Sequence, residues 1–74
     1  MKAGEWYYTN GGNYENWSQV LFADEFCVVL RIEKARSADH KTVADLGGRG
    51  PVYVFHSAVA ASVGRTLVTE CLAS

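Results

Sequence analysis

The segment from Trp6 to Trp17 constrains the fold of this chain most, because its centre carries a strong hairpin signal. The run Asn10-Gly11-Gly12-Asn13 lies between two stretches of high strand propensity. Asn-Gly and Gly-Gly steps in that setting are typical of two-residue hairpin turns. With Gly11 and Gly12 as the turn, the pattern predicts two antiparallel strands in which Trp6 lies opposite Trp17. We call this element the aromatic hairpin.

Both faces of the aromatic hairpin carry aromatic side chains, since side chains along a strand alternate between its faces. One face carries Trp6, Tyr8 and Trp17, and the other carries Tyr7, Thr9 and Tyr14. A domain of 74 residues is too small to bury both faces, so we expect one of them to meet a partner. We expect the tryptophan face to pack on the core and the face of Tyr7 and Tyr14 to be exposed.

Size and composition indicate one small domain, residues 1–74, that self-associates into a homo-oligomer. Hydrophobic residues make up 49% of the chain, more than one small core needs, and oligomerisation is a common way to cover the surplus. The net charge of −1 argues against a general attraction to nucleic acid. Residues 51–74 carry only Arg65 and Glu70 as charged side chains, but polar residues interrupt them, so we expect no membrane span.

The segment 25–33 is the clearest strand, with Phe26, Val28, Leu30 and Ile32 on the face that we expect to meet the core. Residues 52–56 read as a second strong strand, and residues 42–46 as a short one. Between these two, Gly47-Gly48-Arg49-Gly50-Pro51 predicts a turn. The segment 18–24 fits a helix or a strand.

Residues 57–72 decide the fold class, and their sequence leaves two alternatives open. As one helix, the segment would begin at Ser57 as N-cap, with apolar side chains recurring every four residues. As a short helical turn over 58–62, it would break at Gly64 and continue as a strand over 65–72. The second alternative predicts a mainly β protein, a small antiparallel SH3-like barrel or roll with one short helical turn. The first predicts an α+β fold with a C-terminal helix over residues 57–72.

Candidate catalytic chemistry is sparse in this sequence. His56 ends a predicted strand and is a weak candidate acid or base, with Glu15 or Asp24 as its partner. Cys27 and His56 could form a nucleophile pair, but apolar neighbours raise a thiol's pKa, so we expect Cys27 to be buried and unreactive. The cysteine and histidine spacing predicts no metal site, and no sequence motif predicts a cofactor.

Cysteine usage bears on the cellular location. Two cysteines, Cys27 and Cys71, are too few for a disulfide framework, and the first residues show no apolar signal segment. We therefore expect reduced thiols and a cytoplasmic protein.

The sequence favours a binding module over an enzyme. We expect a self-associating protein that binds a protein partner or a small molecule on the aromatic hairpin surface, through Tyr7, Tyr8, Asn13, Tyr14 and Trp17. The first alternative is a small oligomeric enzyme with an interface active site around His56. The second is a single-stranded nucleic-acid binder that uses Tyr8, Trp17 and the basic side chains between Arg31 and Lys41. Glu33 and Asp39 dilute that basic patch, so nucleic acid is the less expected partner.

Overall fold

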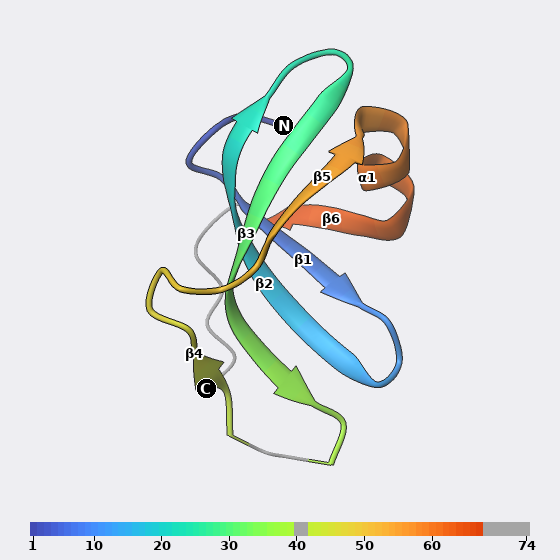
Figure 1. Cartoon of the computed structure of the whole chain (residues 1–74). Coiled ribbons are helices and arrows are strands. Elements are labelled where there is room, and N and C mark those ends of the chain that lie inside the picture. Colours follow the sequence, from blue (N-terminus) through green and yellow to red (C-terminus); the bar gives the residue numbers. More distant parts are fainter. Residues whose placement is uncertain (40–41, 68–74) are drawn as a thin grey trace.

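The computed structural model describes residues 1–39 and 42–67 as one antiparallel sheet with a single short helix (Figure 1). In chain order the elements are β1 (Trp6–Asn10), β2 (Tyr14–Ala23), β3 (Cys27–Ser37), β4 (Ala44–Asp45), β5 (Val52–His56), α1 (Ser57–Val63) and β6 (Gly64–Leu67). The predicted strand over 52–56 is confirmed, and β4 is shorter than the predicted 42–46. The ambiguous segment 18–24 belongs to the long strand β2.

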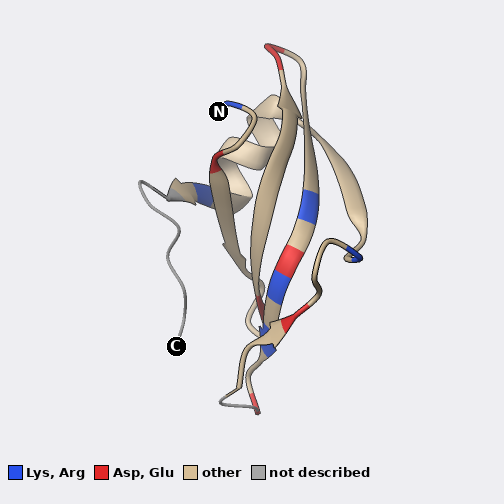
Figure 2. Ribbon diagram, turned by 90° about the vertical axis from the view of Figure 1, so that its left-hand side faces the viewer, with Lys and Arg blue, Asp and Glu red and all other residues tan. Residues whose placement is uncertain are grey.

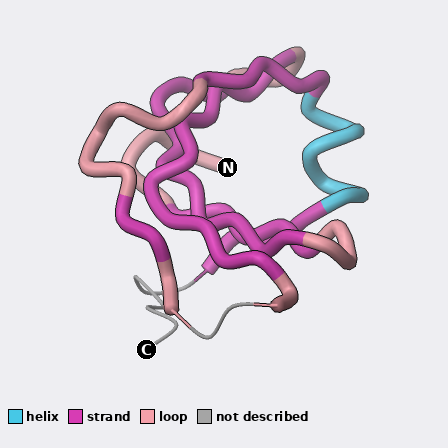
Figure 3. Tube along the Cα trace, turned by 60° about the horizontal axis from the view of Figure 1, so that its bottom comes forward, coloured by secondary structure: helices cyan, strands magenta, loops and turns pink. Residues whose placement is uncertain are grey.

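Sheet order makes the fold a roll rather than a closed barrel. The strands follow the order β4-β3-β2-β1-β6, and β5 pairs with β3 on the same edge as β4. From β5 the chain crosses through α1 to β6, which pairs with β1. Figure 3 shows α1 spanning one side of the roll. The mainly β fold with one short helix is thus confirmed, as a roll that does not close into a barrel.

The alternative of a single C-terminal helix over 57–72 is wrong for the residues that the structure describes. The helix α1 ends at Val63, and Gly64 begins the strand β6. The backbone of Gly64 is extended, so the chain leaves the helical conformation there. Residues 68–72 of the predicted strand lie outside the described part of the chain.

The hairpin forms, but its register differs from the prediction. Trp6 lies opposite Gln19, and Tyr8 lies opposite Trp17, so the predicted Trp6–Trp17 pair is wrong. The Gly11 N–H donates to the carbonyl of Tyr14 at 3.0 Å, which makes Gly12 and Asn13 the central residues of the turn. Gly12 has φ +90°, a backbone conformation that glycine adopts readily and other residues rarely do, which explains a glycine at the first central position.

One of the two irregularities in the pairing of β2 with β3 decides which side chains of β3 share a face. Trp17 pairs with Lys34 and Ser18 with Ile32, which leaves Glu33 as an extra residue in β3. One extra residue reverses the alternation of side chains beyond it. Lys34 and Arg36 therefore lie on the face opposite that of Ile32. We call the face that carries Tyr7, Val28, Leu30 and Ile32 the inner face, and the one that carries Tyr8, Trp17 and Val29 the outer face.

The hydrophobic core lies on the inner face, between the sheet and α1. It consists of Tyr7, Val20, Val28, Leu30 and Ala60, with Ala23 and Phe55 packed against it. Val28 and Leu30 lie on the predicted core face of β3, whereas Phe26, expected on the same face, is 66% exposed. The reason is that β3 begins only at Cys27, so Phe26 belongs to the turn that precedes it.

Tyr7 joins the first strand to the end of the chain's described part. Its side chain is 1% exposed, and its hydroxyl donates to the carbonyl oxygen of Ala60 at 2.5 Å, across 53 positions in sequence. Burial raises the pKa of the Tyr7 hydroxyl, which keeps it a donor. A Cβ on Gly64 would lie 2.4 Å from Cζ of Tyr7, so only glycine lets β6 approach the ring this closely. The contacts of Tyr7 with Ala60 and Gly64 therefore hold α1 and β6 against β1 in the roll.

Replacing Gly12 by alanine should destabilise the protein, whereas replacing Gly11 should change little. A Cβ at either position meets no atom within 4 Å, but only Gly12 has a positive φ. The expected cost is about 1–2 kcal/mol for Gly12→Ala, because L-residues are strained in that region. Urea denaturation of the two variants measures this difference. Equal stabilities would place the turn elsewhere.

Tyr7→Phe should be more destabilising than Tyr53→Phe. The first variant keeps the ring but leaves the buried carbonyl of Ala60 without the hydroxyl donor, at a cost of about 1–3 kcal/mol. Tyr53 is 47% exposed, so its variant is a matched control for the loss of a hydroxyl. Thermal unfolding of both variants is the measurement, and equal Tm values would contradict the role given to Tyr7.

Candidate functional site

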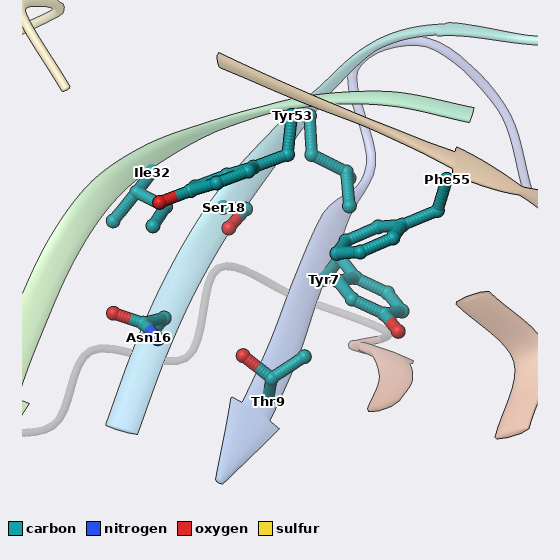
Figure 4. A pocket seen from close by; sticks show the side chains of 8 residues that line it. Tyr7, Thr9, Asn16, Ser18, Ile32, Tyr53 and Phe55 are labelled. Atoms are coloured by element: carbon teal, nitrogen blue, oxygen red, sulfur yellow. The ribbon is translucent and has the colours of Figure 1, made fainter. Parts of the chain in front are cut away.

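A groove lies on the inner face, between β5 and the aromatic hairpin (Figure 4). Its floor is formed by the apolar side chains of Tyr7, Leu30 and Ile32. Tyr53 and Phe55 reach over it from β5, with their rings stacked at a centroid distance of 6.3 Å. We call this site the inner groove.

Polar side chains line the hairpin side of the inner groove. Thr9 comes from β1, and Asn16 and Ser18 come from β2. Thr9 and Asn16 lie opposite each other in the β1–β2 register, and Ser18 lies opposite Tyr7, which places all of them on the inner face. The inner groove therefore offers aromatic and aliphatic surface on one side and hydroxyl and amide groups on the other.

The inner groove holds a cavity of about 190 Å³ and continues into a wider hollow beside the hairpin turn. Thr9, Asn16 and Phe55 belong to both. Asn13 and Tyr14 line the second hollow, and Val63 at the end of α1 lies on its other side. The two hollows together form one continuous path along the inside of the hairpin.

The five predicted binding residues separate into two groups. Tyr7, Asn13 and Tyr14 line this path, whereas Tyr8 and Trp17 lie on the outer face. Tyr14 is 60% exposed, as expected, but Tyr7 is buried, and the prediction that it is exposed is wrong. The reason is that β6 and α1 cover Tyr7, a contact that spans most of the chain and that the hairpin sequence alone does not reveal.

On the outer face, Tyr8 and Trp17 form a cluster with three charged side chains. Their rings lie 5.4 Å apart between centroids. The guanidinium of Arg36 lies 5.6 Å from the Trp17 ring centroid, and that of Arg65 lies 5.1 Å from the Tyr8 ring centroid. Such distances allow cation–π attraction. Trp17 is buried within this cluster.

Glu15 connects the members of the outer-face cluster by hydrogen bonds. Its Oε2 accepts a hydrogen bond from the Tyr8 hydroxyl at 2.7 Å, and its Oε1 accepts from Nε and Nη2 of Arg36 at 3.0 and 2.7 Å. The Tyr8 hydrogen bond, and then Arg36, lower the pKa of the Glu15 carboxyl, while the same bond raises the pKa of Tyr8. Within this cluster Glu15 neutralises Arg36, and these contacts join β1, β2 and β3 on the outer face.

Basic residues lie along β3 (Figure 2), and the side chains of two of them are paired with carboxylates. Nε of Arg31 lies 2.8 Å from Oε1 of Glu33, and Arg36 is bound to Glu15. Lys41, the last member of the predicted patch, lies outside the described residues, as does His40. Binding of single-stranded nucleic acid uses aromatic rings on which bases stack and basic side chains that contact the phosphates. Because Trp17 is buried and these two arginines are paired with carboxylates, the structure gives this alternative little support.

Cys27 and His56, which the sequence did not favour as a nucleophile pair, lie side by side where β3 begins and β5 ends. Cys27 lies directly opposite His56 in the β3–β5 register. Burial, and then the charge of Asp24, raise the pKa of the Cys27 thiol, the reverse of what an activated nucleophile needs. Cys27 is half-buried rather than buried as expected, because it lies on the outer face, opposite the core side chains Val28 and Leu30 of the same strand.

His56 and Asp24 have structural contacts in this region. Nδ1 of His56 accepts a hydrogen bond from the Ala58 N–H at 3.2 Å, so His56 caps α1 in place of the predicted Ser57. The Ser57 hydroxyl donates instead to the Asp24 carbonyl at 3.1 Å. The Asp24 carboxylate accepts the N–H groups of Phe26 and Cys27, which lower its pKa. Glu15, the other predicted partner of His56, belongs to the outer-face cluster.

Metal and membrane features are also absent from the described residues. Among residues 1–39 and 42–67, no group of three or more His, Cys, Asp or Glu side chains could hold a metal ion. The same part of the chain contains no helix of the length and apolar character that crossing a membrane requires.

Comparison of the chain with protein-family models, with curated proteins and with solved structures finds no match. The geometry of the site is therefore the basis for a functional conclusion.

Sequence reasoning missed Tyr53 and Phe55 as site residues, although they form one wall of the inner groove. A signal for them was present in the sequence. The strand 52–56 carries no charged residue and places its two aromatic side chains at alternate positions, on one face. That face meets the hairpin only because β5 pairs with β3 and curves over the sheet.

The outer-face cluster predicts a pH dependence of stability that Glu15→Gln removes. A carboxyl whose pKa is lowered on folding stabilises the protein above its ordinary pKa, about 4.3 for Glu, and loses this contribution as pH falls through the lowered value. The wild-type Tm should therefore exceed that of Glu15→Gln near neutral pH, and the difference should shrink in acid. Glu25→Gln, in the exposed β2–β3 turn, is the control. A constant difference between wild type and Glu15→Gln would contradict the linkage.

Proposed function

We propose that this protein is a small, self-associating binding module that recognises a protein partner through the inner groove. The observation that carries this proposal is the inner groove itself, an aromatic and aliphatic cavity with hydroxyl and amide groups along one side. Concave sites of this composition, with a few convergent polar groups, are the usual places where proteins bind ligands. A cytoplasmic location, expected from the cysteine usage, belongs to the same proposal.

The size of the cavity favours a protein side chain over a free small molecule. Sites for drug-sized ligands measure about 300–1,000 Å³. The cavity of about 190 Å³ over the apolar floor is smaller than that and suits a single aromatic or branched aliphatic side chain, while the wider hollow beside the turn has room for the residues that flank it. Anchoring by one buried apolar side chain is typical of protein interfaces, where a few such residues supply most of the affinity.

The polar side of the inner groove suits the backbone of such a partner. Thr9, Asn16 and Ser18 provide hydroxyl and amide groups next to the apolar floor. The wider hollow beside the turn, with Asn13 and the exposed Tyr14, offers further contacts to the residues that flank the anchor. Tyr and Asn side chains are well suited to this role, because they combine contact area with adaptable hydrogen bonding.

Tyr53→Ala tests the proposal with small probes in place of the partner. We expect N-acetylphenylalanine amide and N-acetylleucine amide to shift the backbone amide NMR signals of Thr9, Asn16 and Ser18 in the wild type. N-acetyllysine amide should not, because the floor of the groove is apolar. Tyr53→Ala removes one wall and should weaken the response at least several-fold, whereas Val59→Ala, exposed on α1, should leave it unchanged.

Three results would count against the inner groove as the binding site. They are shifts centred on the outer-face cluster, an equal response to the lysine probe, and an unchanged response in Tyr53→Ala. Since Tyr53 is 47% exposed, its replacement should leave the fold intact, and a circular dichroism spectrum checks this.

A further inference from the structure

We infer that β5 is the self-association surface and that two copies of the chain join their β5 strands antiparallel about a two-fold axis. This inference rests on the self-association in the proposed function and locates it, but it does not depend on the inner groove. Three properties of β5 support it: a free edge, the absence of charge along that edge, and the match of the strand with itself.

One edge of β5 has backbone groups without partners in the described sheet. On its other edge, the Ile32 N–H donates to the Pro51 carbonyl and the Ser57 N–H donates to the Phe26 carbonyl. Backbone groups of an antiparallel strand point alternately to its two sides. Those of Val52 and Val54, and the N–H of His56, therefore point away from β3, and among the described residues β5 pairs with no other strand.

Within residues 1–39 and 42–67, the free edge shows none of the features that normally prevent pairing. Edge strands are protected by lysines, inward charges, bulges or a covering loop. No residue of Val-Tyr-Val-Phe-His is charged, and Val52, Tyr53 and Val54 are all exposed. Figure 2 shows the charged residues along β3 and none on β5. An uncharged strand is complementary to another uncharged strand, and a second copy of the chain supplies one.

A two-fold register centred on Val54 satisfies the free groups of both strands. Val54 then lies opposite the partner's Val54 and exchanges two hydrogen bonds with it. His56 lies opposite the partner's Val52, so its N–H reaches that carbonyl, and the symmetry repeats the bond. Each hydrogen-bonded pair of this register joins residues whose backbone groups point outward, as an antiparallel ladder requires.

Side chains on both faces of the joined sheet also match. On the outer face, Phe22, Val29 and Val54 form a row across three strands, because Phe22 pairs with Val29 and Val29 with Val54. Phe22 is 50% exposed and Val54 is 66% exposed, and pairing at Val54 would continue this row into the second copy. On the inner face, Tyr53 would lie opposite the partner's Phe55, a favourable aromatic cross-strand pair.

Val54→Lys tests this surface, with Val63→Lys as the matched control. Both valines are exposed, at 66% and 51%, but Val63 lies on α1. Light scattering from micromolar to millimolar concentration should give a mass of two chains for the wild type and Val63→Lys, and half that mass for Val54→Lys. The lysine should be tolerated on an edge strand, and Tm verifies folding.

Cross-linking tests the two-fold register itself. Val54→Cys, with Cys27 and Cys71 replaced by serine, should form a symmetric disulfide on mild oxidation, because Cα atoms of a hydrogen-bonded pair lie about 5.5 Å apart, within disulfide range. Val63→Cys in the same background should not cross-link. A dimer without the Val54 cross-link, or a dimer that survives Val54→Lys, would overturn the assignment of β5.

The outcomes separate this inference from the proposed function. A mass of one chain at every wild-type concentration would refute self-association, and a mass above two chains would refute the two-fold β5 pair. The response of Thr9, Asn16 and Ser18 to N-acetylphenylalanine amide should persist in Val54→Lys, since Val54 points to the outer face. Loss of that response in a folded Val54→Lys variant would show that the groove and the strand edge are not independent.

Discussion

The contact of Tyr7 with Ala60 and Gly64 is the constraint on which the rest of the structure depends. A sheet of this size is open by default, and here the hydroxyl of one buried tyrosine reaches a carbonyl 53 residues away. Because Gly64 has no side chain that would clash with the ring, β6 can pair with β1. Because β5 leads directly into α1, the same contact holds β5 over the hairpin and creates the inner groove.

The extra residue Glu33 in β3 separates the chemistry of the two faces. Without it, Arg36 would share the inner face with Ile32, and a charge would lie in the groove. With it, Arg36 reaches Glu15 and Trp17 on the outer face, and the groove keeps its apolar floor. The charged groups thus stabilise the back of the sheet, which leaves the inner face to aromatic, aliphatic and small polar side chains.

The strand β5 unites the two proposals made for this protein. Its inward side chains, Tyr53 and Phe55, line the inner groove, while its outward backbone groups and Val54 form the free edge. In the proposed dimer, Tyr53 of one copy would approach Phe55 of the other, and the two inner grooves would lie on the same face of a continuous sheet. Binding and self-association would then use different sides of one short, uncharged strand.

The local pattern of the sequence determined the hairpin, the core face of β3 from Val28 to Ile32, the strand Val52–His56 and the turn at Gly47. It also determined which aromatic residues of the hairpin share a face. The observed register differs from the predicted one by two residues, and an even shift leaves every side chain on its predicted face. Tertiary structure alone decided that Tyr7 is buried, that Glu33 bulges, and that Tyr53 and Phe55 face the hairpin. Alternation and turn residues act over neighbouring positions, whereas these features arise from strand pairing and contacts between segments far apart in the chain.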